Sequence, residues 1–168
     1  MEQNYIGISE DRLHRILGVA RKAYKIAKDM GYDENFCRKM FMEGWIHDVG
    51  YEFAKQQDEH PHISSEMLYQ LFSYNCKDIY SADISVKTNQ AIYYHSKYPA
   101  EHIEMNIEWK ILTMADMTVD FKGNEVTVSQ RLDDIKNRYG EHSDQYLTAC
   151  DICYRIGLTA VNFAANIT

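Results

Sequence analysis

Apolar residues recur at helical spacing along most of the chain, with polar residues between them. The first such series begins after Ser9, a good N-cap, and runs from Leu13 to Ala27 before Gly31 provides a stop. Asp33 can cap a second series, which ends near Val49-Gly50. Because both spacings match the period of an α-helix, we expect a helix over each series.

Five later segments carry the same period. They run approximately from Ile63 to Leu71, Ile79 to His95, Ile107 to Val119, Ser129 to Tyr139 and Ser143 to Ala165. The whole chain has only 2 prolines and 8 glycines, so few positions can interrupt long helices. The alternation in Glu125–Val128 could instead form a short strand. The pattern predicts an all-α bundle of six or seven helices.

Length, composition and charge narrow the class of protein. The 168 residues fit a single domain over residues 1–168, and the formal net charge of −7 argues against general affinity for nucleic acid or anionic membranes. The sequence has neither an apolar run of about 18 residues nor the basic and apolar regions of a signal peptide. We therefore expect a cytoplasmic protein without membrane association, and a homodimer is compatible with the sequence.

Histidine and aspartate residues stand among apolar neighbours or at the ends of the predicted helices. The candidates are His14, His47, Asp48, His60, His62, His95 and Asp116. A lone histidine on an apolar helix face is more often a core residue than a ligand. Several such groups on different helices favour a shared site, because each buried charge without a partner would cost several kcal/mol. A shared metal site would satisfy them together.

The donor types limit the metal. Imidazole nitrogen and carboxylate oxygen suit iron, manganese, nickel or cobalt, with zinc less favoured and magnesium preferring a shell of oxygens. These candidates outnumber the four ligands of a closed structural zinc site, so we expect one or two divalent ions. Two ions bridged by one carboxylate would use the candidates better.

Five segments follow one another in a recognisable order. They are residues 12–20 (RLHRILGVA), 44–50 (GWIHDVG), 60–68 (HPHISSEML), 91–95 (AIYYH) and 111–116 (ILTMAD). In the residues and the order of these five segments, the chain resembles the HD-domain metal-dependent phosphohydrolases over residues 10 to 120. The resemblance implies a compact HD-type helical bundle whose metal-activated water attacks a phosphoester or phosphoanhydride.

The resemblance also assigns roles to residues. It implies the metal ligands His14, His47, Asp48, His60, His95 and Asp116, with His47 and Asp48 at the centre of catalysis and Asp48 common to both ions. By its place in the motif His60 is favoured over His62, which stays an alternative ligand or a neighbour of the site. Glu43, one helical turn before His47, could orient that imidazole.

The substrate side departs from the family. Many two-metal relatives have Lys three residues after the Asp of the His-Asp pair, where this chain has Tyr51. The cations that could replace it are Lys97, Lys110, Arg131 and Arg21. Tyr94 could stack on a nucleobase. The family analogy favours a small phosphorylated molecule, above all a nucleotide, as the substrate.

Three alternatives remain at the level of sequence. The first is a dinucleoside polyphosphate hydrolase, against which the missing lysine counts. The second is a non-catalytic, metal-containing module that senses a nucleotide. The third is a structural bundle whose histidines bind nothing, which elemental analysis of the purified protein would reveal.

Overall fold

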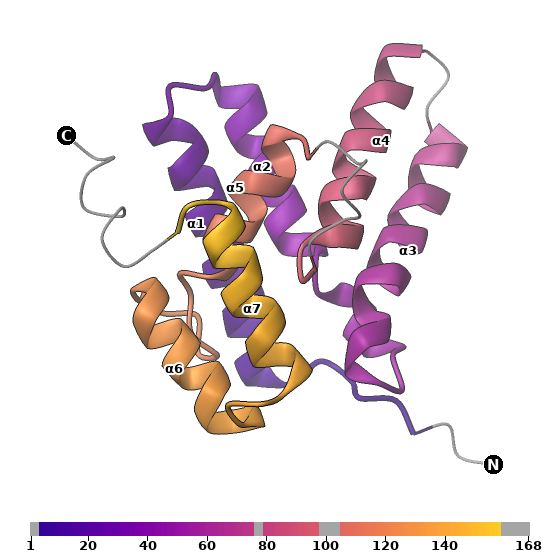
Figure 1. The fold of residues 1–168 in the computed structure, drawn as a ribbon. Coiled ribbons are helices and arrows are strands. Elements are labelled where there is room, and N and C mark those ends of the chain that lie inside the picture. The colour runs from indigo at the N-terminus through magenta and orange to yellow at the C-terminus, as the bar shows by residue number, and fades with distance from the viewer. Residues whose placement is uncertain (1–3, 76–78, 98–104, 159–168) are drawn as a thin grey trace.

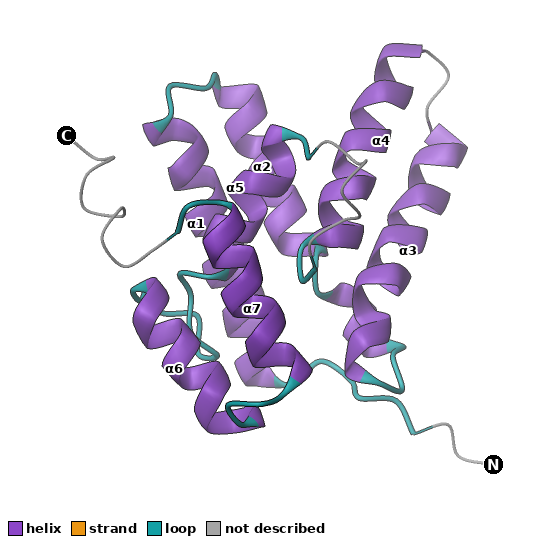
Figure 2. Ribbon diagram, viewed as in Figure 1, coloured by secondary structure: helices purple, strands orange, loops and turns teal. Residues whose placement is uncertain are grey.

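The computed structural model describes residues 4–75, 79–97 and 105–158 and is helical throughout its regular elements (Figures 1 and 2). The helices are α1 (Glu10–Asp29), α2 (Glu34–Ile46), α3 (His60–Asn75), α4 (Ile79–Tyr94), α5 (Ile107–Asp116), α6 (Val128–Tyr139) and α7 (Asp144–Arg155), with two short 3-10 helices, η1 (Val49–Glu52) and η2 (Gln57–Glu59). The all-α prediction is confirmed.

The helices associate in three groups. The first consists of α1, α2 and α5, which pack on one another. The hairpin of α3 and α4 lies to one side of them and joins the group through α5 and η1, and the pair of α6 and α7 lies on another side (Figure 1). Residues from all three groups, among them Arg15 of α1, His60 of α3 and Arg131 of α6, line one cavity.

Capping residues explain where the helices begin. Ser9 and Asp33 accept hydrogen bonds from the backbone N–H groups of Arg12 and Phe36, as the sequence predicts. Asn106, Thr127 and Ser143 cap α5, α6 and α7 in the same way. Each cap satisfies a backbone N–H that has no partner inside its helix.

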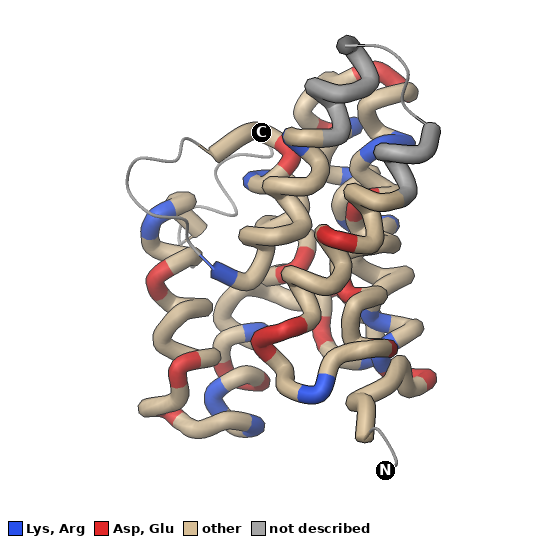
Figure 3. Tube along the Cα trace, turned by 90° about the vertical axis from the view of Figure 1, so that its right-hand side faces the viewer, with Lys and Arg blue, Asp and Glu red and all other residues tan. Residues whose placement is uncertain are grey.

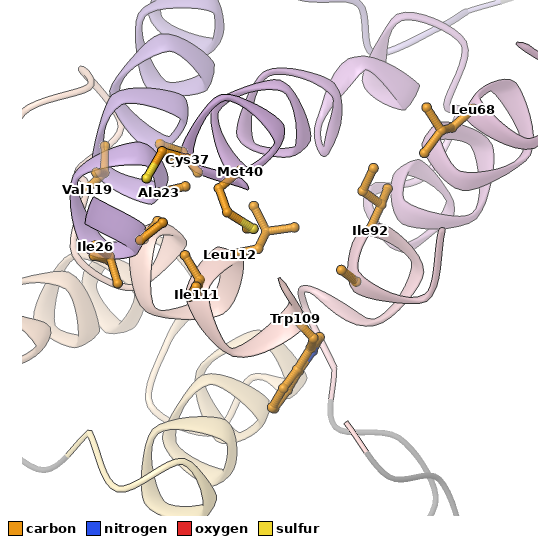
Figure 4. Packing of buried hydrophobic residues seen from close by; sticks show 14 residues of the cluster. Ala23, Ile26, Cys37, Met40, Leu68, Ile92, Trp109, Ile111, Leu112 and Val119 are labelled. Carbon is orange, nitrogen blue, oxygen red and sulfur yellow. The ribbon is translucent and has the colours of Figure 1, made fainter. Parts of the chain in front are cut away.

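The main core lies between α1, α2, α4 and α5. In Figure 4, Met40 of α2 and Leu112 of α5 face each other, and Ile92 of α4 lies toward Leu68 of α3. A smaller cluster that includes Met117, Ile135 and Cys153 joins α6 and α7 to the end of α5. The two clusters fix the C-terminal pair of helices against the rest of the bundle, because apolar burial favours each contact.

Several predicted boundaries shift. α2 ends at Ile46 and η1 follows, whereas the sequence predicts a helix to Val49-Gly50. α5 ends at Asp116 rather than Val119, and α7 ends at Arg155, before the predicted Ala165; residues 159–168 lie outside the described part.

The Glu125–Val128 segment is not a strand, because it forms only an isolated bridge between Val119 and Glu125. Among the residues described, no helix has both the length and the apolar character needed to cross a bilayer.

Candidate metal centre

The histidines and aspartates that converge come from helix ends. His47 and Asp48 follow the last turn of α2, His60 begins α3, and His95 directly follows α4. Asp116 is the last residue of α5. Helix ends suit this role because the chain leaves the cylinder there, so that side chains from several helices can meet at one point.

The Oδ1 atom of Asp48 lies at the centre of the group. It is 3.4 Å from His47 Nε2, 3.2 Å from His60 Nε2 and 3.4 Å from His95 Nε2. The Nε2 atoms of His60 and His95 are 3.3 Å apart, and His47 Nε2 is 3.4 Å from Asp116 Oδ1. His47, Asp48, His60 and His95 are buried, and the Asp116 side chain is 15% exposed.

The orientation of each imidazole is set by its own helix. The Nδ1 atoms of His47, His60 and His95 contact the carbonyl oxygens three residues earlier, at Gly44, Gln57 and Ile92. Because a carbonyl oxygen can only accept, each Nδ1 carries the proton. In the neutral rings, three Nε2 lone pairs then point toward one carboxylate oxygen, and His47 Nε2 has no hydrogen-bond partner among the described residues.

This arrangement fits a bound cation. Four ligands placed tetrahedrally at about 2.0 to 2.1 Å from an ion stand about 3.3 to 3.4 Å apart. The atoms Asp48 Oδ1, His60 Nε2 and His95 Nε2 form a triangle with edges of 3.2, 3.4 and 3.3 Å. His47, Asp48 and His95 also form a buried group that could hold a metal ion.

The directions of the pKa shifts of Asp48, Asp116 and His60 suit metal binding. Burial by itself raises the pKa of the Asp48 carboxyl, but His47 and the other imidazoles hold it well below its usual range. Burial also opposes ionisation of Asp116, whose pKa is nevertheless lowered by Arg15 and His47. Burial lowers the pKa of His60, which keeps that imidazole neutral. Burial also opposes the charged form of His47, but Asp48 and Asp116 raise the pKa of this imidazole. Ionised carboxylates and neutral imidazoles are the forms that bind metals, so a metal bound at His47 would displace a proton.

Arg15 already provides one positive charge beside the group. Its Nη2 atom donates to Asp116 Oδ1 at 2.6 Å and to the Asp116 carbonyl at 3.3 Å, and its Nη1 donates to the Val119 carbonyl at 2.6 Å. The Arg15 side chain is 8% exposed. Asp116 is therefore partly neutralised by a guanidinium that belongs to the chain.

A second arginine of α1 lies over the same group. The Arg12 guanidinium is 3.5 Å from the centroid of the Tyr51 ring, and its Nη1 is 3.5 Å from Asp48 Oδ2. On its other side Tyr51 stacks on His60, with ring centroids 3.8 Å apart. Tyr51 thus packs against both the guanidinium of Arg12 and the imidazole of His60.

Close backbone packing holds η1 against α3. The N–H of Gly50 donates to Ser64 Oγ at 2.8 Å. A Cβ atom at position 50 would lie 2.2 Å from the His60 carbonyl oxygen, so only glycine fits there. This contact fixes the distance between Asp48 and His60, which belong to the two segments that it joins.

The structure does not bring every predicted residue to the group. His14 is exposed and its side chain lies outside it, because the turn of α1 directs the next residue, Arg15, inward. The His62 side chain is 67% exposed and lies 3.8 Å from Glu66. Glu43 forms no hydrogen bond with His47, since its Oε1 accepts from Thr88, its Oε2 has no partner among the described residues, and His47 Nδ1 faces the Gly44 carbonyl.

Of the residues predicted to bind substrate, one lies at the cavity and the others lie elsewhere. Only Arg131 lines the cavity beside the group, and Lys110 and Arg21 are exposed elsewhere. Lys97 lies 3.9 Å from the centroid of the Tyr93 ring, and the carbonyl of Tyr94 accepts from the Trp109 indole.

Sequence reasoning missed Arg12 and Arg15 as neighbours of the group. The signal was available, because Arg15 shares the buried stripe of α1 with Ile16 and Val19, and an arginine in such a stripe needs a buried partner.

A cavity of about 460 Å³ opens over the group. Its floor includes Asp48, His60 and Asp116, and its walls come from α1 on one side and from α6 and α7 on the other. Phe121 and Tyr139 add aromatic surface to the wall. This volume lies within the range of small-molecule sites, about 300 to 1,000 Å³.

Comparisons with protein-family models, with curated proteins and with solved structures each found no match. The function of this chain therefore has to be inferred from its own residues and their geometry.

Proposed function

We propose that the chain is a metal-dependent phosphohydrolase that cleaves a phosphoester or phosphoanhydride of a small molecule, in particular a nucleotide. The observation that carries the proposal is the convergence of three imidazole Nε2 atoms on Asp48 Oδ1 at 3.2 to 3.4 Å. Its support from sequence is the resemblance of the five segments to HD-domain phosphohydrolases.

The proposed ligands are Asp48, His60 and His95, with His47 and Asp116 beside them. When bound, a divalent transition metal would lower the pKa of water to about 7 and polarise a phosphoryl group. We favour one ion over two, because Arg15 donates at 2.6 Å to the Asp116 oxygen that a second ion would need. His14, which is exposed, has no part in the revised ligand set.

The other residues of the cavity have roles in this proposal. Arg12 touches Asp48 Oδ2 and lines the cavity, so its guanidinium can bind a phosphoryl oxygen next to the ion. Tyr51 holds the planes of Arg12 and His60 by stacking. Phe121 and Tyr139 offer aromatic faces for a nucleobase.

A non-catalytic, metal-containing nucleotide sensor is the second candidate. The ion pair between Arg15 and Asp116 favours it, because a carboxylate held by a guanidinium is less able to act on a metal or on water. The two candidates predict the same metal content and differ in turnover.

The test begins with elemental analysis of protein purified without chelator from cells supplied with iron, manganese, cobalt, nickel and zinc. We expect about one ion per chain in the wild type and none in Asp48→Asn. His14→Gln is the matched control and should keep its metal, because His14 lies outside the group.

Hydrolysis is then assayed with the loaded protein on mononucleotides, nucleoside di- and triphosphates, cyclic nucleotides and dinucleoside polyphosphates. Turnover that disappears in Asp48→Asn and persists in His14→Gln supports the hydrolase. Metal binding without turnover of any substrate favours the sensor. A wild-type protein that binds no metal contradicts both candidates.

A further inference from the structure

The cavity wall formed by α6 and α7 carries arginines that have no role in the proposed metal centre. Arg131 and Arg138 lie on the same face of α6 as Ile135, and all three line the cavity. These residues follow the five segments that carry the family resemblance. The chain as a whole is acidic, and acidic and basic residues are interspersed along the helices seen in Figure 3, so this gathering of arginines is local.

Arg131 is buried and only partly paired. Its side chain is 8% exposed, and its Nη1 donates to Asp134 at 2.6 Å. Its Nε atom is buried and has no hydrogen-bond partner among the described residues. A buried guanidinium whose donors are only partly satisfied is costly. Because the Nε atom is enclosed, the terminal nitrogens of Arg131 are the atoms that could reach a ligand in the cavity.

The two arginines share one carboxylate. Arg138 Nη2 also contacts Asp134 Oδ2, at 2.9 Å, so two positive charges of α6 face a single negative one. Burial, followed by the charge of Arg15, lowers the pKa of Arg131 to about 10. The exposed acids that line the cavity, Asp11, Asp58 and Asp144, form no ion pair with either arginine in the part of the chain that the structure describes.

We infer that Arg131 and Arg138 form an anion subsite for a phosphate group other than the one that reacts beside Asp48. The inference rests on the proposed function for the identity of the reacting group. Arg12 and Arg15 of α1 form ion pairs with Asp48 and Asp116, respectively. The arginines of α6 belong to a different wall of the cavity. The preferred ligand is accordingly a compound with two phosphates, such as a diphosphate, rather than a monophosphate.

The probes are inorganic pyrophosphate and orthophosphate, titrated calorimetrically into the 168-residue chain, both as purified and after chelator treatment. The wild type should bind pyrophosphate about tenfold or more tighter than orthophosphate, because a second phosphate gains charge-assisted hydrogen bonds. Arg131→Gln should remove most of that preference. Equal affinity of the wild type for the two anions would overturn the inference.

Asp134→Asn provides a test of opposite sign. It frees both arginines from their shared carboxylate and should raise the affinity for pyrophosphate about threefold or more. A purely structural role of Arg131 predicts no such gain, and an unchanged affinity in this variant would count against the subsite even if Arg131→Gln failed to fold. Arg38→Gln, on the exposed face of α2, is the control and should leave both affinities unchanged.

Metal content separates the two proposals. If the wild type holds no metal but prefers pyrophosphate, and Asp134→Asn strengthens that binding, the anion subsite stands and the proposed hydrolase does not. If the protein holds metal and turns over a nucleotide while Arg131→Gln and Asp134→Asn bind pyrophosphate as the wild type does, only the subsite is removed.

Discussion

Glu43 allows a quantitative test of burial near the candidate centre. Its side chain is 1% exposed, Thr88 donates to its Oε1 at 2.6 Å, and Lys39 Nζ lies 3.6 Å from the same atom. Its Oε2 has no hydrogen-bond partner among the described residues. Burial outweighs the attraction of Lys39 and raises the pKa of Glu43 from 4.5 to about 7.

The raised pKa makes folding stability depend on pH in one direction. Because the folded protein binds this proton more tightly than the unfolded chain, the free energy of unfolding falls as pH rises from about 4.5 to about 7. A difference of about 2.5 in pKa corresponds to about 3 kcal/mol. Glu43→Gln resembles the protonated carboxyl and lacks this fall, so the variant should gain about 3 kcal/mol relative to the wild type between pH 4.5 and pH 7.5.

Urea unfolding at several pH values, with chelator present and followed by tryptophan fluorescence, measures the difference. Trp109 is 1% exposed and should report loss of the core. Glu10→Gln, at an exposed position in the first turn of α1, is the control and should show no comparable gain. A difference between Glu43→Gln and wild type that stays constant over this range would refute the reasoning, since it would mean that Lys39 keeps the carboxylate ionised.

Three further changes probe the centre and its frame. If the proposed ligand set is right, an added divalent metal should raise the melting temperature of the wild type and of His14→Gln but not that of Asp48→Asn; equal loss of this increase in both variants, measured by calorimetry, would contradict the ligand set. Arg15→Gln should lower the free energy of unfolding by about 3 kcal/mol, because it leaves the largely buried Asp116 without its guanidinium, and denaturation with an unchanged midpoint would contradict this. Gly44→Ala should cost about 1 to 3 kcal/mol, because a Cβ there would lie 2.6 Å from the Ala20 Cα where α1 crosses α2; a stability equal to the wild type's would show that the two helices can separate without cost.

The helices were largely predictable because their signals are local. Ser9 and Asp33 cap α1 and α2 as the sequence predicts, and apolar periodicity locates the starts of the remaining helices to within a few residues, although α7 ends at Arg155, well before the predicted Ala165. Ends were harder to predict, since α2 stops at Ile46 where the chain turns into η1. That turn depends on the contact of Gly50 with Ser64, which joins segments 14 residues apart.

The sequence by itself determined which residue types lie at the helix ends, because the helical period and the caps fix these positions along the chain. It placed His47, Asp48 and His60 near such ends without reference to any other part of the molecule. Only the tertiary structure decided which neighbour faces inward. Adjacent residues of a helix point about 100° apart, so the packing of α1 against α5 directs Arg15 to Asp116 and leaves His14 in solvent.

The same holds for the wall of α6 and α7. A local pattern can mark Arg131 as part of a helical stripe with Val128 and Ile135, but not what that stripe faces. The smaller apolar cluster, which joins these helices to Met117 at the end of α5, brings the arginines of α6 to the cavity above Asp48. Contacts between segments so distant along the chain are set by the burial of apolar surface in three dimensions, which no local sequence signal specifies.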